Sequence, residues 1–292
     1  MLVKTLRTIF GKALFLVLFI SITGGAARAQ KIPTSTLSNL SAADVRKPQS
    51  DKAPNSAAIA TKVLVRAVAR DAKVIYDRVG GAKITIKELS GGKILAEGVQ
   101  KGGSGDSTAI MIQPRARGVK VFDTPGTAGF SVTLMLEKPT LVEITAEGPL
   151  NYPNSMQRAS KTVLLVPGEE ISGEGILLEL HGFIVAPAQN QPVMQITAGH
   201  PFDFSVLVMM LCGCPTEPKG MWDADKIKVT AKVLKGEKVI EELQLNPVAG
   251  QLSTFSGKLK PKEKGQYQIR ILAIDSVNAN FGIMEQKFVV DQ

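Results

Sequence analysis

The sequence predicts an all-β protein, in which two consecutive β-sandwich domains follow a cleaved signal peptide and a disordered tether. Apolar and polar residues alternate with a period of two through most of the chain after residue 61, and no apolar pattern of helical period is long enough to predict a helix. Glycine-rich breaks recur every 8–12 residues or so, a spacing of about one strand and one turn that is typical of sandwiches. With only two cysteines, the fold must rest on apolar cores.

The N-terminal segment has the order of a secretory signal peptide. Basic residues within the first twelve positions precede an apolar run over residues 13–22, and Ala27 and Ala29 supply small residues for cleavage. We therefore predict cleavage after Ala29. The apolar run has about ten residues where a membrane-spanning helix needs about 20. The mature protein is expected in the periplasm or outside the cell, with no stable membrane span.

The charge of the chain argues against nucleic acid as a partner. Residues 1–29 carry four basic residues and no acid, so their removal lowers the formal net charge from +9 to +5. A nucleic-acid surface needs clustered Lys and Arg with interleaved aromatic residues, and the sequence has no such run. The charge predicts solubility rather than a ligand.

The rest of the chain divides by composition. Residues 30–60 are rich in Ser, Ala, Pro, Thr and Lys without an apolar period, which predicts a disordered tether. The remaining 230 or so residues are enough for two domains of ordinary size. We place the first at 61–186 and the second at 192–292, because Pro187 and Pro192 flank a stretch with no apolar period.

The first domain begins with alternation in which Val63, Val65, Ala67 and Ala69 share one face and Lys62, Arg66 and Arg70 the other. Further strands are predicted at 84–87, 130–136, 142–145 and 176–181. The opening, with Gly81-Ala82-Lys83-Ile84-Thr85-Ile86 as its second strand, resembles transthyretin-like, carboxypeptidase-regulatory-type β-sandwich domains. The resemblance covers about 25 residues, and it implies a non-catalytic module that displays loops or contacts a neighbour.

The second domain is predicted to contain strands at 194–197 (strand A), 202–211 (B), 226–234 (C), 238–245, 253–259, 265–275 and 288–290. The stretch from Gly265-Gln266-Tyr267 to Asp275 resembles the penultimate strand of bacterial Ig-like repeats of the polycystic-kidney-disease (PKD) or cadherin type. The resemblance implies that Tyr267 is a corner tyrosine, whose hydroxyl bonds to nearby backbone.

The loop from Cys212 to Asp225 holds both cysteines and the only tryptophan. In an Ig-like sandwich this B–C loop shares a pole with the F–G loop at 276–282, and the pole should face the first domain. Three interpretations of Cys212 and Cys214 stay open. They form a structural disulfide, they form a redox-active or partner-linking pair, or they bind a soft ion such as Cu(I) with a nearby methionine. No other cofactor is predicted.

Other residues of this pole are candidate contacts for a partner or ligand: Met221, Trp222, Asp223, Asp225, Asn278 and Asn280. Trp222 suits a sugar or peptide platform, or packing over the cysteines. The acidic and amide side chains could hold calcium, although calcium needs six or more oxygen ligands.

The sequence lacks the parts of an enzyme. It has no nucleophile elbow, no zinc-protease helix motif and no cofactor loop. Its two histidines are separated, with His181 on the polar face of a strand and His200 at the pole opposite Cys212. We expect a non-enzymatic exported protein that presents sandwich loops to a periplasmic or envelope partner protein. The alternatives are a copper- or redox-linked protein acting through Cys212 and Cys214, and a carbohydrate-binding module.

Overall fold

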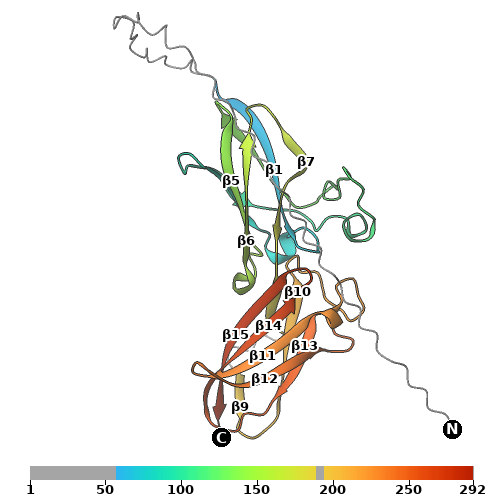
Figure 1. Ribbon diagram of the computed structural model, residues 1–292, viewed down its shortest axis with the longest axis vertical. Coiled ribbons are helices and arrows are strands. Elements are labelled where there is room, and N and C mark those ends of the chain that lie inside the picture. The colour runs from blue at the N-terminus through green and yellow to red at the C-terminus, as the bar shows by residue number, and fades with distance from the viewer. Residues whose placement is uncertain (1–56, 189–193, 292) are drawn as a thin grey trace, which may run out of the picture. The chain divides into compact units, whose positions relative to one another are not determined.

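The computed structural model describes residues 57–188 and 194–291, which belong to one compact unit (Figure 1). The predicted signal peptide and nearly all of the predicted tether lie outside the described residues. Within the described part, no helix has the length and apolar character needed to cross a membrane. The fold is all-β, as the sequence predicts, and consists of two sandwiches that we call the first and second sandwich.

The first sandwich packs two sheets face to face. One sheet has the order β4-β1-β7, in which β1 runs antiparallel to β4 and parallel to β7. The other has the order β3-β2-β5-β6 and is antiparallel throughout. The bounds are β1 Ile59–Ala69, β2 Lys83–Glu88, β3 Ile94–Val99, β4 Phe130–Leu136, β5 Thr140–Gly148, β6 Gln157–Leu165 and β7 Ile171–Leu180, with short helical turns η1 Asp77–Val79, η2 Thr108–Ile112 and η3 Pro153–Ser155.

In strand β1, the alternation of apolar and polar residues predicted the buried apolar face correctly, but it did not predict that the opposite face is also covered. Val63, Val65 and Ala67 are fully buried between the two sheets. On the opposite, polar face, Arg66 is nevertheless only 6% exposed. Its Nε donates to the Ala128 carbonyl oxygen at 3.2 Å and its Nη1 to the Gly173 carbonyl oxygen at 2.6 Å. The long connection over residues 100–129 covers this face, which alternation within β1 cannot reveal.

The second sandwich contains eight strands in the order β8-β10-β13-β12-β11-β14-β15-β9. The bounds are β8 Phe183–Pro187, β9 Met194–Thr197, β10 Phe202–Met210, β11 Lys228–Lys235, β12 Lys238–Pro247, β13 Thr254–Leu259, β14 Gly265–Asp275 and β15 Asn280–Asp291, with the turn η4 Ala224–Lys226. Strand β12 pairs with β11 along most of its length and with β13 at its end, so it passes from one sheet to the other. Strands β10 and β13 then face β11, β14 and β15, which is an Ig-like arrangement.

The first strand of this sandwich differs from the prediction. The predicted strand A, 194–197, pairs in parallel with the last strand, β15. Residues 183–187 instead pair with β10, although the sequence analysis placed most of them in the first domain. The apolar run Phe183-Ile184-Val185 gives no sign of which sheet it joins. Likewise Ile59 and Ala60, placed in the tether, pair with Leu136 and Met135 in β1 and β4.

Tyr267 confirms the corner predicted from the Gly-x-Tyr motif. Its hydroxyl donates to the backbone oxygen of Glu263 at 2.7 Å, four residues upstream. Its ring stacks on Phe288 with centroids 5.3 Å apart. The side chain is 4% exposed, so the hydroxyl has a partner where water is largely excluded.

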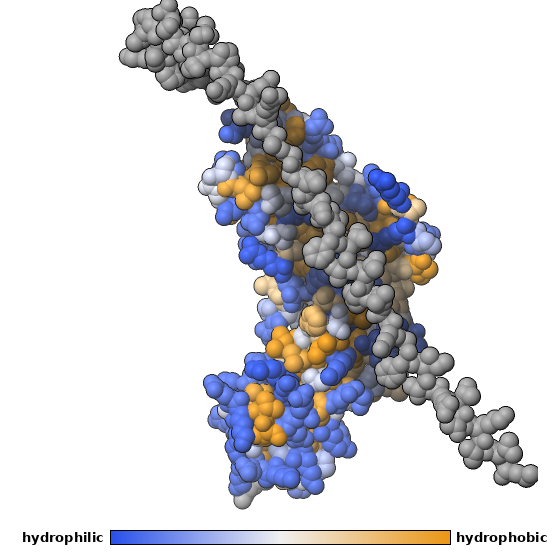
Figure 2. All heavy atoms as spheres, viewed as in Figure 1, coloured by the Kyte–Doolittle hydropathy of each residue, from blue (hydrophilic) through white to orange (hydrophobic). Residues whose placement is uncertain are grey.

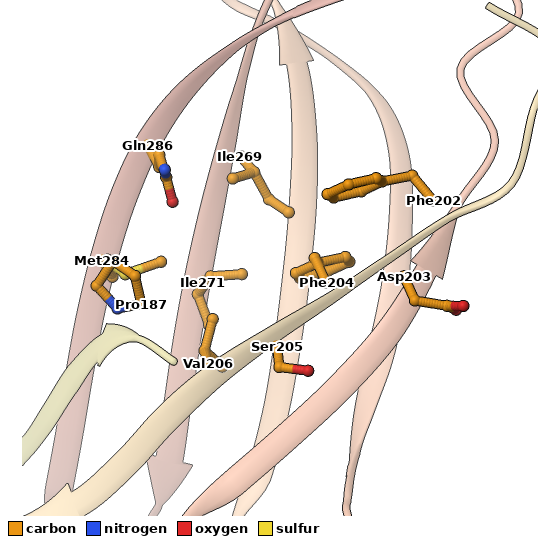
Figure 3. A pocket seen from close by; sticks show the side chains of 10 residues that line it. All are labelled: Pro187, Phe202, Asp203, Phe204, Ser205, Val206, Ile269, Ile271, Met284 and Gln286. Carbon is orange, nitrogen blue, oxygen red and sulfur yellow. The ribbon is translucent and has the colours of Figure 1, made fainter. Parts of the chain in front are cut away.

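A small gap of about 130 Å³ lies between the two sheets of the second sandwich (Figure 3). Phe202 and Phe204 of β10 approach it from one sheet, and Ile269 and Ile271 of β14 from the other. Pro187, the last residue of β8, which pairs with Val206 of β10, also lines the gap. Because core side chains form its walls and Asp203 is paired with Lys258, we assign it to packing rather than to function.

Candidate functional site

The B–C loop packs against the first sandwich through its cysteine turn. Cys212 and Cys214 are joined by a disulfide, and both are buried. Gly213 between them has φ +72°, and a Cβ there would lie 2.5 Å from Cγ1 of Val79 in the first sandwich. A side chain at 213 would therefore clash, and glycine is required both for this approach and for the left-handed conformation.

The bonded cysteines do not present a soft-metal site. Sulfur atoms bonded to each other are not thiolates, and thiolate is the form that binds Cu(I). Met210, the methionine two residues before Cys212, is 3% exposed and packs in the core. Among the described residues, no group of three or more His, Cys, Asp or Glu side chains is arranged to hold a metal.

Trp222 is tied to the first sandwich rather than free to bind a ligand with its polar end. Its Nε1 donates to the Asp71 backbone oxygen at 2.8 Å, and its ring packs against the main core. Asp71 follows β1 and has φ +53°, so its carbonyl is presented by a tight left-handed turn. Within the B–C loop, the backbone amide of Glu217 donates a hydrogen bond to the Trp222 carbonyl oxygen at 3.0 Å.

The carboxylates of this pole bind their own loops. Asp223 Oδ1 accepts from the backbone amides of Lys219 at 2.8 Å and Asp225 at 3.2 Å. The Lys219 amide is the main cause that lowers the pKa of Asp223, so the carboxylate is held in its charged form. In the F–G turn, Asp275 accepts from the amides of Val277 and Asn278 and from the Asn278 side chain. These hydrogen bonds stabilise the B–C and F–G turns, and they engage carboxylate oxygens that a calcium site at this pole would need as ligands.

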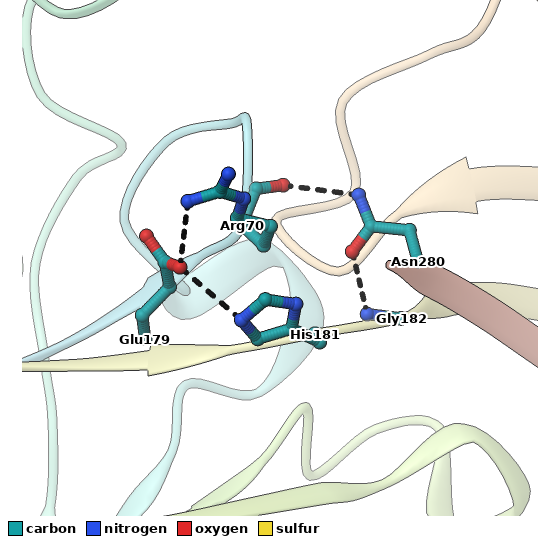
Figure 4. A network of polar contacts seen from close by, with 5 residues as sticks. All are labelled: Arg70, Glu179, His181, Gly182 and Asn280. Atoms are coloured by element: carbon teal, nitrogen blue, oxygen red, sulfur yellow. Dashed lines mark hydrogen bonds and ion pairs between the residues drawn. The ribbon is translucent and has the colours of Figure 1, made fainter. Parts of the chain in front are cut away.

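Asn280 connects the two sandwiches. The prediction that it is a surface contact for a partner or ligand is wrong. It is fully buried, its Oδ1 accepts from the Gly182 amide at 2.8 Å, and its Nδ2 donates to the Arg70 backbone oxygen at 3.3 Å (Figure 4). Beside it, Glu179 Oε1 contacts Arg70 Nη1 at 3.1 Å and His181 Nε2 at 3.2 Å. We call this region, with Gly213 and Trp222, the junction.

The predicted B–C and F–G residues do meet. A pocket of about 170 Å³ has Met221, Trp222 and Asp223 on one side and Asp275 and Asn278 on the other. Asp225 lies outside it and is exposed. His200 remains separate, on the exposed turn before β10, where its Nδ1 lies 3.2 Å from the Ala198 oxygen.

An apolar patch on the outer face of β14 and β15 was missed by the sequence analysis. Phe281 pairs with Ile274 and Ile283 with Leu272, so the four side chains are neighbours across two strands. Phe281 is 51% exposed and Ile283 45% exposed. Figure 2 shows hydrophobic residues on this face of the second sandwich. In the sequence, the patch is signalled by the apolar Phe281 and Ile283, which occupy odd-numbered positions of β15, whereas the buried Met284 and Phe288 occupy even-numbered positions. We call this surface the β14–β15 patch.

Comparisons with known proteins identify no family for this chain. No family model and no curated protein matches it. Similar solved structures include an engineered protein (17% identity, 44% of this chain and 24% of that one, TM-score 0.29) and fibronectin(III)-like modules of CbhA from Clostridium thermocellum (10%, 80% and 95%, 0.26). Another is an I-band fragment of titin (14%, 80% and 66%, 0.24). This chain spans about a quarter of the engineered protein. At these TM-scores the likeness carries no argument, and the strand order itself assigns the Ig-like fold.

Proposed function

We propose that this protein is a non-enzymatic, exported binding protein that docks a periplasmic or envelope protein partner on the β14–β15 patch. The patch is the observation that carries the proposal, because contiguous exposed apolar surface is costly to leave in water and commonly marks an interaction site. Val277, in the turn between β14 and β15, is 90% exposed.

The geometry favours this function over the two alternatives. The Trp222 ring packs against the main core and the two cysteine sulfurs are bonded to each other, whereas a sugar platform needs an open ring face and a soft-metal site needs thiolates. Met221, 51% exposed beside the small pocket, remains available to a partner. We further propose that the first sandwich is a transthyretin-like module and the second a PKD- or cadherin-type repeat, for which the Tyr267 corner is the support.

Site-specific photocrosslinking in the producing cells tests the proposal. A photoreactive residue at Phe281 should give one discrete adduct with a single protein. The same residue at Ile240, which is 47% exposed on β12, is the matched control and should give none. If the additional substitution Ile283→Asp abolishes the adduct formed from position 281 without changing the melting temperature, docking on the patch is supported. Equal adduct patterns at 281 and 240 would refute it.

A further inference from the structure

A second surface feature, independent of the patch, is a cleft of about 630 Å³ in the first sandwich. It lies where the ends of β1 and β7 meet the connection over residues 100–129, and all the residues that line it belong to the first sandwich. Its floor includes Val68, Ile110 and Phe122, which belong to a small apolar cluster separate from the main core, and the partly buried Leu177. The volume lies within the 300–1,000 Å³ or so that is typical of small-molecule sites.

Three cations surround this apolar floor, and each is held in place by the chain. Arg115 donates from Nη2 to the Ile110 oxygen at 2.9 Å, and its guanidinium lies 5.5 Å from the centre of the Phe122 ring. Lys161 Nζ donates to the Leu177 oxygen at 3.0 Å. Arg70 contacts Glu179. Because these bonds fix the side chains before binding, the cost of ordering them for a ligand is reduced.

Arg70 also carries an unsatisfied donor. Its Nε is buried and has no hydrogen-bond partner within the described part of the chain. A buried N–H without a partner is destabilising, and such groups are rare in folded proteins. Neither carboxylate of the cleft, Glu179 or Asp71, hydrogen-bonds to this Nε, and Glu179 Oε1 instead contacts Arg70 Nη1 and His181 Nε2.

We propose that the cleft binds an organic anion whose carboxylate is attached to an apolar chain. The carboxylate accepts hydrogen bonds from Arg70, Arg115 and Lys161, and guanidinium groups suit it because their N–H donors match its two oxygens. The apolar chain lies on Val68, Ile110, Phe122 and Leu177. Three cations against two carboxylates leave the cleft with an excess positive charge, which selects anions over cations of the same shape.

Isothermal titration of the mature protein with octanoate tests this inference, with acetate and octylammonium as ligand controls. Octanoate should bind with one site per chain, and neither control should bind at the same concentrations. Arg115→Gln and Lys161→Gln should each weaken octanoate about tenfold, because each removes a charge-assisted hydrogen bond. The matched control is Arg117→Gln, an exposed residue of the same connection that does not line the cleft, which should change affinity less than twofold.

The outcomes are separable from those for the partner-binding proposal, because the substituted side chains are exposed and lie outside the β14–β15 patch. An unchanged melting temperature shows that each variant is folded. Absence of octanoate binding, equal binding of octylammonium, or equal weakening by Arg117→Gln would each overturn the inference. Anion binding that follows Arg115 and Lys161 would establish it, whatever the result at Phe281.

Discussion

The indole of Trp222 donates a hydrogen bond to the backbone oxygen of Asp71, a residue 151 positions earlier in the chain. This bond and the Asn280 bridge connect the end of β1 to the B–C and F–G loops of the second sandwich. The buried cores of the two sandwiches form one continuous cluster at this place. The loops predicted to bind a ligand therefore also attach one sandwich to the other.

Replacing Trp222 by Phe should destabilise the protein by about 1–2 kcal/mol, because the Asp71 carbonyl loses its donor while the ring packing is largely kept. The free energy of unfolding by urea, followed by circular dichroism, measures this. Replacement of the exposed Phe281 by Leu should leave stability within about 0.5 kcal/mol. Equal stability of wild type and Trp222→Phe would mean that the bond contributes nothing.

Asn280→Ala should be more disruptive, with a loss of about 2–3 kcal/mol, because it leaves the Gly182 amide without its acceptor in a buried place. Asn246, an exposed asparagine on β12, is the matched control, and Asn246→Ala should have little effect. Hydrogen exchange should show faster exchange of the Gly182 amide in Asn280→Ala only. Protection of that amide in the variant would contradict the assigned role.

The cysteine pair should act as a structural link. The native protein should contain no thiol that reacts with a thiol reagent, and two after unfolding and reduction. The double variant Cys212→Ala/Cys214→Ala should lose about 1–2 kcal/mol, since a very short loop contributes little chain entropy. Retention of Cu(I) by the native protein, with loss in the double variant, would instead favour the metal alternative.

Asp71 should make stability depend on pH. Partial burial raises the pKa of Asp71 above its usual value, and the charges of Asp275 and Glu179 raise it further while Arg70 opposes them. The folded state therefore binds this proton more tightly than the unfolded state. The resulting contribution to the free energy of unfolding is fully present below the unfolded-state pKa and is lost as pH rises through the folded-state pKa. Asp71→Asn should raise the melting temperature at about pH 7 and less so at about pH 4. Asparagine also tolerates the positive φ of this turn. An equal effect at both pH values would contradict the assignment.

Local patterns predicted much of the fold because a half-buried strand shows its buried face as alternation. Val63, Val65 and Ala67 in β1 and Ile269, Ile271 and Ala273 in β14 are buried as the pattern required. The Gly-x-Tyr motif placed the Tyr267 corner correctly, since the bond it makes spans only four residues. Loop order in an Ig-like sandwich was enough to bring Met221 and Trp222 to the same pocket as Asn278.

What the sequence by itself determined was the all-β class, most of the strands and the pole where the candidate residues gather, because each depends on contacts close in the chain or on a regular period. The tertiary structure alone decided the rest. Whether 183–187 joins β7 or β10, whether Arg66 is covered, and whether Asn280 faces solvent or Gly182 depend on partners many residues away. No local pattern encodes such a partner, since an apolar strand or a polar side chain suits several sites until packing and hydrogen bonding select one.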